Sequence, residues 1–242
     1  MSQGLGDLIV RRIRAAGPIT VAAFMAEALG HPRLGYYITR DPLGTEGDFT
    51  TAPEISQTFG ELIGAWCAVV WRALGQPRPI RLVEIGPGRG TLMADALRAT
   101  RRAEGFHDAL ALHLIETSPV LRARQAAALA DWSPAWHASW AELPDGPALV
   151  IANELFDALP IRQFVRANDG WHERCVGLGP DDRLAFMLDP RPSLEAQAWL
   201  DPAVSAAPAD AIAEVSPSGR MLARAIGERV AQAGGAIGRA HV

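Results

Sequence analysis

The sequence predicts an α/β fold built on a parallel, doubly wound sheet. Apolar runs of strand length alternate with segments of helical periodicity. A glycine-rich turn at 86–90 joins one of these strands to the helix after it, as in nucleotide-binding sheets. The chain has 242 residues, 49% of them hydrophobic, which is enough for one sizeable core.

Residues 1–75 are expected to form an N-terminal helical cap with a covering loop. Two helices within 5–29 are separated at Gly17-Pro18, and Thr20 is a suitable N-cap for the second. Segment 30–50 is rich in glycine, proline and aromatic residues, which favours a functional loop over disorder.

A long helix is predicted to follow this loop. Thr51 and Glu54 have the spacing of a capping box, with Pro53 in the first turn. The apolar periodicity then continues to about Leu74. Cys67 lies within this apolar run, so a reduced core cysteine is a better interpretation than a disulfide.

The segment 76–160 is expected to form the sheet. Four strands are predicted, at Ile80–Ile85, Ala109–Ile115, Ala135–Ala138 and Pro147–Ala152. Two helices are predicted between them, from Thr91 to about Glu104 and from Pro119 to Ala130. Because strands alternate with helices, the strands are expected to pair in parallel.

The segment 161–242 is expected to hold an inserted hairpin and a last helix. The hairpin would pair Arg162–Arg166 with Trp171–Val176 around an Asn-Asp-Gly turn, and Arg183–Leu188 could add a strand. Residues 189–210 are interpreted as a surface excursion. The helix is expected to begin at Ser216-Pro217 and to stop at Gly234-Gly235.

Composition excludes several function classes. The formal net charge is −4 and no basic block is present, so nucleic acid is not an expected partner. The chain has no lysine, which excludes Schiff-base chemistry and a P-loop lysine. The histidines lack ligand spacing, so no metal site is expected, and no apolar run predicts a membrane span. Without a targeting segment, a bacterial cytoplasmic location is expected.

The glycine loop is the first candidate site. Glu84 ends a predicted strand, and Gly86, Gly88 and Gly90 follow it before a helix. A dinucleotide loop has its third glycine one residue later, and a carboxylate ahead of the loop would repel a pyrophosphate. The same carboxylate can pair with a cation, which favours S-adenosylmethionine with its ammonium and sulfonium. The alternative is a turn kept for packing.

Two further residues follow the next strands. Glu116 ends the second strand, where doubly wound nucleotide folds place an acid for the ribose hydroxyls. It could instead be an acid that favours a helix dipole. Trp140 follows the third strand and could cover an adenine face, or be one more buried tryptophan.

The acceptor end of the site is expected after the fourth strand. Asn153, Glu154 and Asp157 leave its carboxyl end, which is where ligands bind in open α/β sheets. Paired carboxylates could hold a guanidinium through charge-assisted hydrogen bonds. For Asp157, an acid at a helix N-terminus is a competing interpretation.

Three stretches together resemble the MidA-like family of Rossmann-like S-adenosylmethionine-dependent methyltransferases, which includes the mitochondrial complex I assembly arginine methyltransferase. These stretches are Gly35–Tyr37 with Gly47–Ser56, then Val83–Gly90, and Asn153–Pro160. The first and third are more specific than the glycine loop. The resemblance covers the chain from about Leu5 to about Gly235.

The resemblance implies a methyltransferase that acts on a protein side chain, with arginine as the suggested acceptor and a respiratory complex subunit as a possible substrate. It implies that the cofactor, S-adenosylmethionine, meets Glu84 and the loop residues Gly86, Pro87, Gly88 and Gly90 on its methionine side. Glu116 would bind the ribose. The 47–56 loop would close over the site, which adds Asp48, Thr51 and Glu54.

The resemblance stops at the last residues, 234–242. Family members continue from the Ser-Pro helix into a strand carrying Asp-Tyr-Gly, whereas the only tyrosines here are Tyr36 and Tyr37. The sheet is therefore expected to be truncated after the fourth strand, which would lie at an exposed edge. This departure motivates an alternative, an assembly or binding module with weak or no catalysis. A nicotinamide oxidoreductase is a third hypothesis, disfavoured by the glycine spacing.

Overall fold

The computed structural model describes residues 4–39 and 48–240, and its internal contacts group into two compact units. One unit contains Met1–Tyr36 and Ala158–Met221, and the other contains Tyr37–Asp157 and Leu222–Val242. Each unit is discontinuous in sequence, unlike the three consecutive segments expected above. The loop residues 40–47 of the expected covering loop lie outside the described part of the chain.

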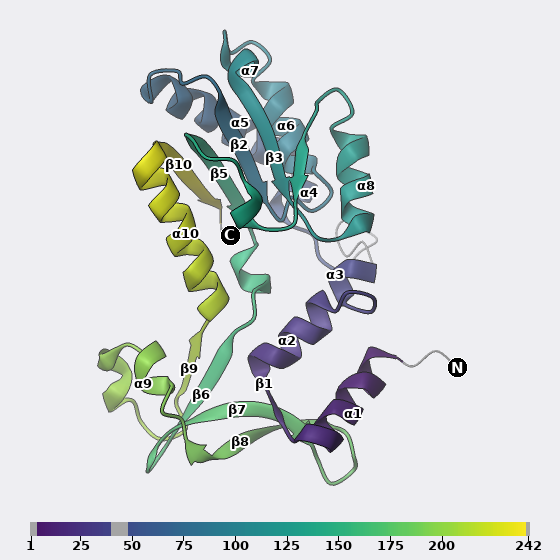
Figure 1. The fold of residues 1–242 in the computed structure, drawn as a ribbon, viewed down its shortest axis with the longest axis vertical. Coiled ribbons are helices and arrows are strands. Elements are labelled where there is room, and N and C mark those ends of the chain that lie inside the picture. Colours follow the sequence, from purple (N-terminus) through teal and green to yellow (C-terminus); the bar gives the residue numbers. More distant parts are fainter. Residues whose placement is uncertain (1–3, 40–47, 241–242) are drawn as a thin grey trace. The chain divides into compact units, whose positions relative to one another are not determined.

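The second unit contains a five-stranded sheet in the order β10-β5-β2-β3-β4 (Figure 1). All four neighbouring pairs are parallel, which confirms the predicted α/β class. The strands are β2 (Ile80–Ile85), β3 (Leu110–Ile115), β4 (Ala135–His137), β5 (Ala148–Asn153) and β10 (Gly235–Ala240). The carboxyl ends of β2, β3 and β5 therefore meet at one edge of the sheet, where the candidate residues follow them.

Two helices of this unit, α5 and α8, begin where a serine side chain satisfies a free backbone N–H group. Ser56 caps α5 by accepting from the Thr58 N–H at 3.3 Å, and Ser118 caps α8 through the Leu121 N–H at 3.4 Å. The helices wholly in this unit are α4 (Ala52–Ile55), α5 (Gln57–Ala73), α6 (Thr91–Ala99), α7 (Phe106–Ala109) and α8 (Pro119–Ala128), with the 3-10 turn η1 (Trp140–Glu142). Three further elements have residues in both units: α3 (Tyr36–Thr39), α10 (Pro217–Ala233) and the 3-10 turn η2 (Phe156–Ala158).

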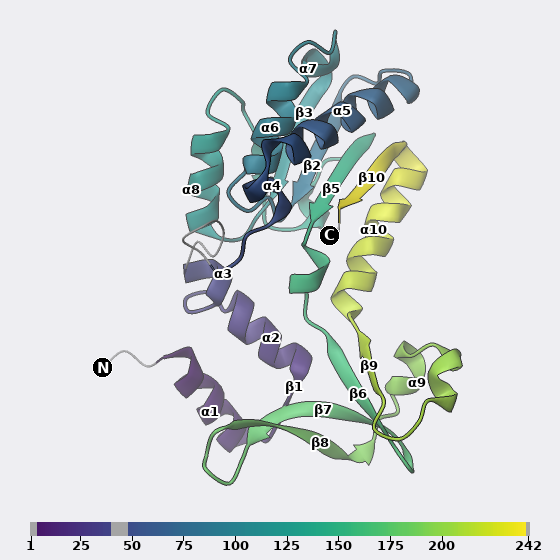
Figure 2. The same ribbon diagram turned by 180° about the vertical axis from the view of Figure 1, so that it is seen from behind.

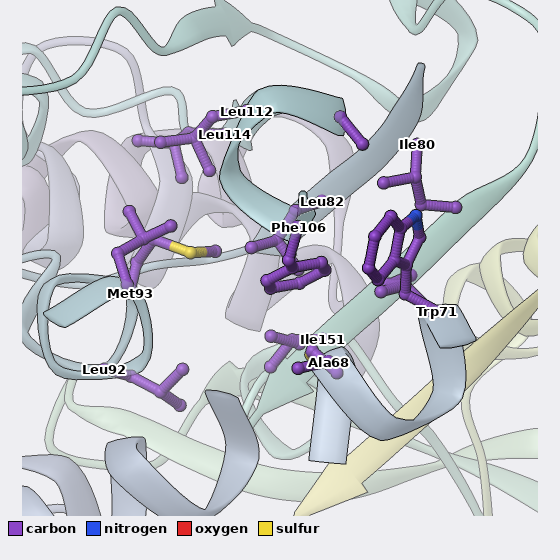
Figure 3. Close-up of a cluster of buried hydrophobic side chains, with 14 of the residues drawn as sticks. Ala68, Trp71, Ile80, Leu82, Leu92, Met93, Phe106, Leu112, Leu114 and Ile151 are labelled. Carbon is purple, nitrogen blue, oxygen red and sulfur yellow. The ribbon is translucent and has the colours of Figure 1, made fainter. Parts of the chain in front are cut away.

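Helices cover both faces of the parallel sheet. Even-numbered residues of β2, such as Leu82, face α5, α6 and α7, where Trp71 and Phe106 pack with ring centroids 5.3 Å apart (Figure 3). Odd-numbered residues, such as Val83, face the other cluster, which includes Ile226 of α10. Figure 2 shows α5 and α6 on the side opposite α10. The two-residue period of a strand thus explains why β2 is apolar along its whole length.

The expectation that the sheet ends at the fourth strand, with that strand at an exposed edge, is wrong. Residues Gly235–Ala240 form β10, which pairs with β5 from Ala148 to Asn153, so β5 is not an edge strand. Sequence reasoning missed β10 because it is rich in glycine and alanine and lacks a strand-like apolar pattern. Packing requires a glycine at position 235, because a Cβ on Gly235 would lie 2.0 Å from the Ala148 carbonyl oxygen.

The first unit contains a separate antiparallel sheet with helices α1 (Leu5–Ala16) and α2 (Val21–Gly30). The predicted hairpin is confirmed, with β6 (Arg162–Ala167) paired to β7 (Gly170–Leu178) and β8 (Leu184–Pro192) added on β7. Short strands β1 (Ile19–Thr20) and β9 (Ile212–Val215) were not predicted. The excursion at 189–210 contains the end of β8, α9 (Ala196–Trp199) and η3 (Pro202–Ala206).

The predicted caps of α2 and α10 are confirmed. The Thr20 hydroxyl accepts from the Ala23 N–H at 3.1 Å, and the Ser216 hydroxyl accepts from the Gly219 N–H at 3.1 Å. The last turn of α10 ends at Ala233, just before the two glycines. Cys67 and Cys175 are both buried and free, as expected for reduced core cysteines.

Candidate cofactor-binding site

The glycine loop between β2 and α6 is tightly folded back on the sheet. Gly86, Gly88 and Gly90 have φ angles of 66°, 55° and 85°, in the left-handed region that favours glycine. The Gly86 N–H donates to the Ile115 carbonyl at 3.0 Å, and the Gly90 N–H donates to the Pro87 carbonyl at 2.8 Å. The loop therefore ends against the first turn of α6 with its backbone in a conformation that other residues adopt only with strain.

Two of these glycines also leave room for close neighbours. A Cβ on Gly86 would lie 3.0 Å from the Leu155 side chain, and one on Gly90 would lie 3.3 Å from Gln125 Cα. The segment after β5 and the helix α8 therefore both approach the loop closely. Close packing against two other segments thus requires glycine at both positions.

Glu84 and Asn153 lie on the same face of the sheet. Glu84 pairs with Ile151 across β2 and β5, and Asn153 is two residues beyond Ile151. Glu84 is only 2% exposed, and burial raises its pKa to about 8. Within the described residues, Glu84 Oε2 and Asn153 Oδ1 are buried acceptors that have no hydrogen-bond donor. An unsatisfied buried acceptor is costly, so both oxygens favour a ligand that donates.

Cys67 of α5 faces this carboxyl group. Burial and the nearby Glu84 raise the pKa of the Cys67 thiol to about 12. The thiol therefore stays protonated at neutral pH and has no nucleophilic role here.

Glu116 is held firmly at the end of β3. Its Oε1 accepts from the N–H groups of Thr117 and Ser118, both at 2.8 Å, and its Oε2 accepts from Gln125 Nε2 at 3.2 Å. Burial raises the pKa of Glu116, and these hydrogen bonds together with the Arg122 charge oppose that rise. The geometry agrees with a carboxylate kept in one orientation after the strand.

Segment 48–56 is joined to the glycine loop by Glu54. Its Oε1 accepts from the Thr91 hydroxyl at 2.6 Å, and its Oε2 lies 3.5 Å from Arg89 Nη1. The predicted capping box is wrong, because Glu54 bonds these partners and Thr51 makes no side-chain cap. Asp48 is exposed, and its predicted role in cofactor binding stays a prediction.

Trp140 lies against α10. The Arg229 guanidinium carbon is 4.8 Å from the centre of its ring, and the tryptophan packs on the cluster that contains Ile226. A face of this ring is thus already occupied by a cation. Its predicted contact with an adenine stays a prediction.

The residues predicted to act on the acceptor follow β5 directly. Glu154 has a φ of 53°, a left-handed conformation that is uncommon for a non-glycine residue and is often found at functional sites. Asp157 lies in η2 and is exposed. Their catalytic roles stay a prediction, supported by this strained backbone beside Asn153, whose Oδ1 is buried.

Gln125 is a site residue that sequence reasoning missed. It is 0% exposed, and its side chain bonds Gly88 as well as Glu116. The only available signal was a glutamine four residues after Leu121 on the buried side of α8. Such a glutamine is ordinarily assigned to the solvent face.

Two features are absent from the described ranges, 4–39 and 48–240. No helix there has the length and apolarity that a membrane crossing requires. No group of three or more His, Cys, Asp and Glu side chains there could hold a metal ion.

Comparison with known proteins identifies the family. Residues 62–240 match the family described as "Putative S-adenosyl-L-methionine-dependent methyltransferase". The chain belongs to this family. The match contains the glycine loop, Glu116 and the residues that follow β5, and it confirms the resemblance inferred from the three sequence stretches.

Curated relatives are similar over nearly the whole chain. "Protein arginine methyltransferase NDUFAF7, mitochondrial" from Danio rerio is 36% identical over 253 residues, covering 94% of this chain and 59% of the relative. The protein of the same name from Homo sapiens is 35% identical, covering 94% and 56%. The chain thus spans less than two thirds of the length of these relatives.

A solved structure shares the fold. A Burkholderia thailandensis protein bound to S-adenosyl-homocysteine has a TM-score of 0.78 and 26% sequence identity, covering 93% of this chain and 59% of that one. A second structure from Burkholderia thailandensis has a TM-score of 0.73 and the same identity. Both agree with a Rossmann-like methyltransferase core.

Proposed function

We propose that this chain is an S-adenosylmethionine-dependent methyltransferase that methylates a protein side chain, with arginine as the acceptor. The family supports the reaction class, and the names of the curated relatives support the acceptor. The observation that carries the proposal is the glycine loop with buried, donor-free oxygens of Glu84 and Asn153 beside it.

The residues present fit this cofactor better than a dinucleotide. Glu84 Oε2 and Asn153 Oδ1 have no hydrogen-bond donor, and both can accept from an ammonium group when Glu84 is ionised, whereas the ionised carboxylate would repel a pyrophosphate. An ammonium beside Glu84 would also favour its charged form and lower its raised pKa. The nicotinamide hypothesis loses support for the same reason.

The cofactor supplies a methyl group that is already activated, so the protein mainly positions the reactants and excludes water. Glu84 and the glycine loop would hold the methionine end, and Glu116 the ribose. Glu154, with Asp157, would orient an acceptor guanidinium and share its charge. Asn153 would receive a donor from either ligand at the end of β5.

Calorimetric titration tests cofactor binding. The wild-type chain is expected to bind S-adenosylmethionine and S-adenosylhomocysteine. No heat of binding at millimolar ligand would contradict the proposal. Pull-down of a partner protein together with no cofactor signal would support the assembly module instead.

Methyl transfer is tested with labelled cofactor and arginine-containing protein substrates. Glu154→Gln removes the charge that would orient the guanidinium and is expected to slow transfer about 100-fold. Binding of S-adenosylhomocysteine should change little. A variant that methylates as fast as the wild type would contradict the role of Glu154.

The acceptor protein is a finer proposal. The family resemblance alone suggests a respiratory complex subunit as the acceptor. Methylation assays on such subunits, with arginine-to-lysine variants of the same subunits as controls, would test it. The bacterial cytoplasmic location also stays a prediction. The names of the curated relatives place those proteins in mitochondria instead.

A further inference from the structure

One buried side chain on α8 contacts three parts of the candidate site. Gln125 Nε2 donates to the Gly88 carbonyl at 2.7 Å and to Glu116 Oε2 at 3.2 Å. Gln125 Oε1 accepts from Trp136 Nε1 at 2.9 Å. The glutamine therefore connects the loop after β2, the carboxylate after β3 and the indole of β4, all within the second compact unit.

Trp136 fixes the direction of this amide. An indole N–H can only donate, so the amide oxygen must face Trp136. The amide nitrogen then gives both of its hydrogens to Gly88 and Glu116. Rotating the amide by half a turn would place its oxygen against two acceptors and its nitrogen against a donor. The arrangement thus allows one orientation, in a residue that is 0% exposed.

Gln125 adds a third hydrogen-bond donor to Glu116 and leaves the carboxylate able to accept another. Thr117 and Ser118 donate to Oε1, and Gln125 donates to Oε2. An ionised carboxylate has about four acceptor positions, so Oε2 keeps capacity for a further donor such as a sugar hydroxyl. The carboxylate is therefore oriented in advance and still able to bind.

The glycine loop depends on the same helix. The Gly88 carbonyl is held by Gln125, and Gly90 approaches Gln125 Cα so closely that an added Cβ would lie 3.3 Å from it. Displacing Gln125 would thus release the loop and the carboxylate together.

We propose that Gln125 is a positioning residue that sets Glu116 and the glycine loop for the cofactor ribose, with its amide direction fixed by Trp136. The inference rests on the proposed function, because Glu116 meets a ribose only if the chain binds S-adenosylmethionine. It predicts that a residue with no cofactor contact of its own controls cofactor affinity.

The experiment measures S-adenosylhomocysteine binding by calorimetry across pH, with thermal unfolding as a check on folding. Gln125→Leu removes a hydrogen bond to a charged group and is expected to weaken binding roughly 10-fold. Trp136→Phe keeps the glutamine but frees its amide, and is expected to weaken binding roughly 3-fold. Gln232→Leu, the same change on an exposed part of α10, should leave affinity unchanged.

The pH dependence of S-adenosylhomocysteine binding distinguishes a Gln125 that positions Glu116 from a Gln125 that only stabilises the fold. The Glu116 pKa is raised by burial and lowered by its donors, Thr117, Ser118 and Gln125, and by the Arg122 charge. Without Gln125 the pKa rises further, so binding in Gln125→Leu should be lost at a higher pH than in the wild type. A purely structural residue would weaken binding equally at every pH.

Each outcome decides a claim. If the wild type binds and folded Gln125→Leu binds equally well, or keeps the wild-type pH dependence, the inference is overturned and the proposed function stands. If Gln125→Leu does not fold, Trp136→Phe decides, and unchanged affinity and pH dependence in that variant overturn the inference. If the wild type does not bind, the proposed function itself has failed.

Discussion

At the residue scale, two glycines of the loop, Gly86 and Gly90, have different physical requirements. Gly86 approaches a side chain, whereas Gly90 approaches the backbone of α8, and both have positive φ angles. A side chain can move aside more easily than a helix backbone. Gly90 is therefore the position where substitution should disturb the site most.

Gly90→Ala is expected to destabilise the chain by about 1–2 kcal/mol and to weaken S-adenosylhomocysteine binding. The added methyl would meet a left-handed φ of 85° and the nearby Gln125 Cα. Thermal unfolding and calorimetry measure both effects. Gly227→Ala is the control, since nothing lies within 4 Å of its added Cβ and a helical alanine should not destabilise.

Glu84 makes stability depend on pH. Burial raises its folded pKa from the usual 4.5 to about 8, so between these values the folded chain holds a proton that the unfolded chain has released. The free energy of unfolding therefore falls as pH rises from about 4.5 to about 8. The isosteric, uncharged Glu84→Gln should lose this dependence.

At pH 8 we expect Glu84→Gln to be roughly 1–3 kcal/mol more stable than the wild type, and near pH 4.5 about equal to it. Denaturant unfolding at several pH values measures the difference. Parallel stability curves would exclude Glu84 as the source. Cofactor binding should weaken in the same variant, because its ammonium would lose a charged partner.

At the element scale, the segment before α5 is attached to the start of α6. Glu54, one of the two side chains of the predicted capping box, bonds Thr91 and Arg89 instead. A bond within one helix turn was replaced by bonds to residues far along the chain, because the folded core brings α4 beside α6. The covering segment is thereby tied to the loop that it was predicted to cover.

Thr91→Val keeps the side-chain shape but removes the hydroxyl donor to Glu54. We expect S-adenosylhomocysteine affinity to fall a few-fold and stability to fall by about 1 kcal/mol, because a part-buried carboxylate loses its short hydrogen bond. Thr58→Val, at an exposed position of α5, is the matched control. Equal affinity in the two variants would show that this bond does not support the site.

At the scale of the whole molecule, residues 235–240 add a fifth strand to the parallel sheet, next to β5. β10 pairs along six residues of β5, and Ala236 packs on the core cluster that contains Trp71. An uncovered β5 would present unpaired backbone groups at the edge of an apolar sheet. β10 therefore both stabilises the second unit and covers an edge prone to aggregation.

A chain shortened to end at Ala233 is expected to lose about 2–5 kcal/mol of stability and to aggregate where the full chain does not. Light scattering and thermal unfolding test this. Ile237→Thr, a change at a side chain that is 45% exposed, should be nearly neutral and serves as the control. A shortened chain as stable and soluble as the full one would contradict the role of β10.

Local patterns were enough for the parallel sheet, the glycine loop and the helix caps at Thr20 and Ser216. These features depend on residues close in sequence, such as the two-residue period of β2 and the positive φ angles that glycine permits. Family membership followed from motifs of the same kind.

The pairing of β10 with β5, the partners of Glu54 and the buried position of Gln125 emerged only from the folded chain. Each depends on contacts between segments far apart in sequence, which no local period encodes. A glycine-rich strand lacks an apolar pattern, and a glutamine resembles a surface residue until its three partners surround it. The candidate site therefore owes its loop to local sequence, whereas the contacts of Glu54 and Gln125 depend on tertiary packing.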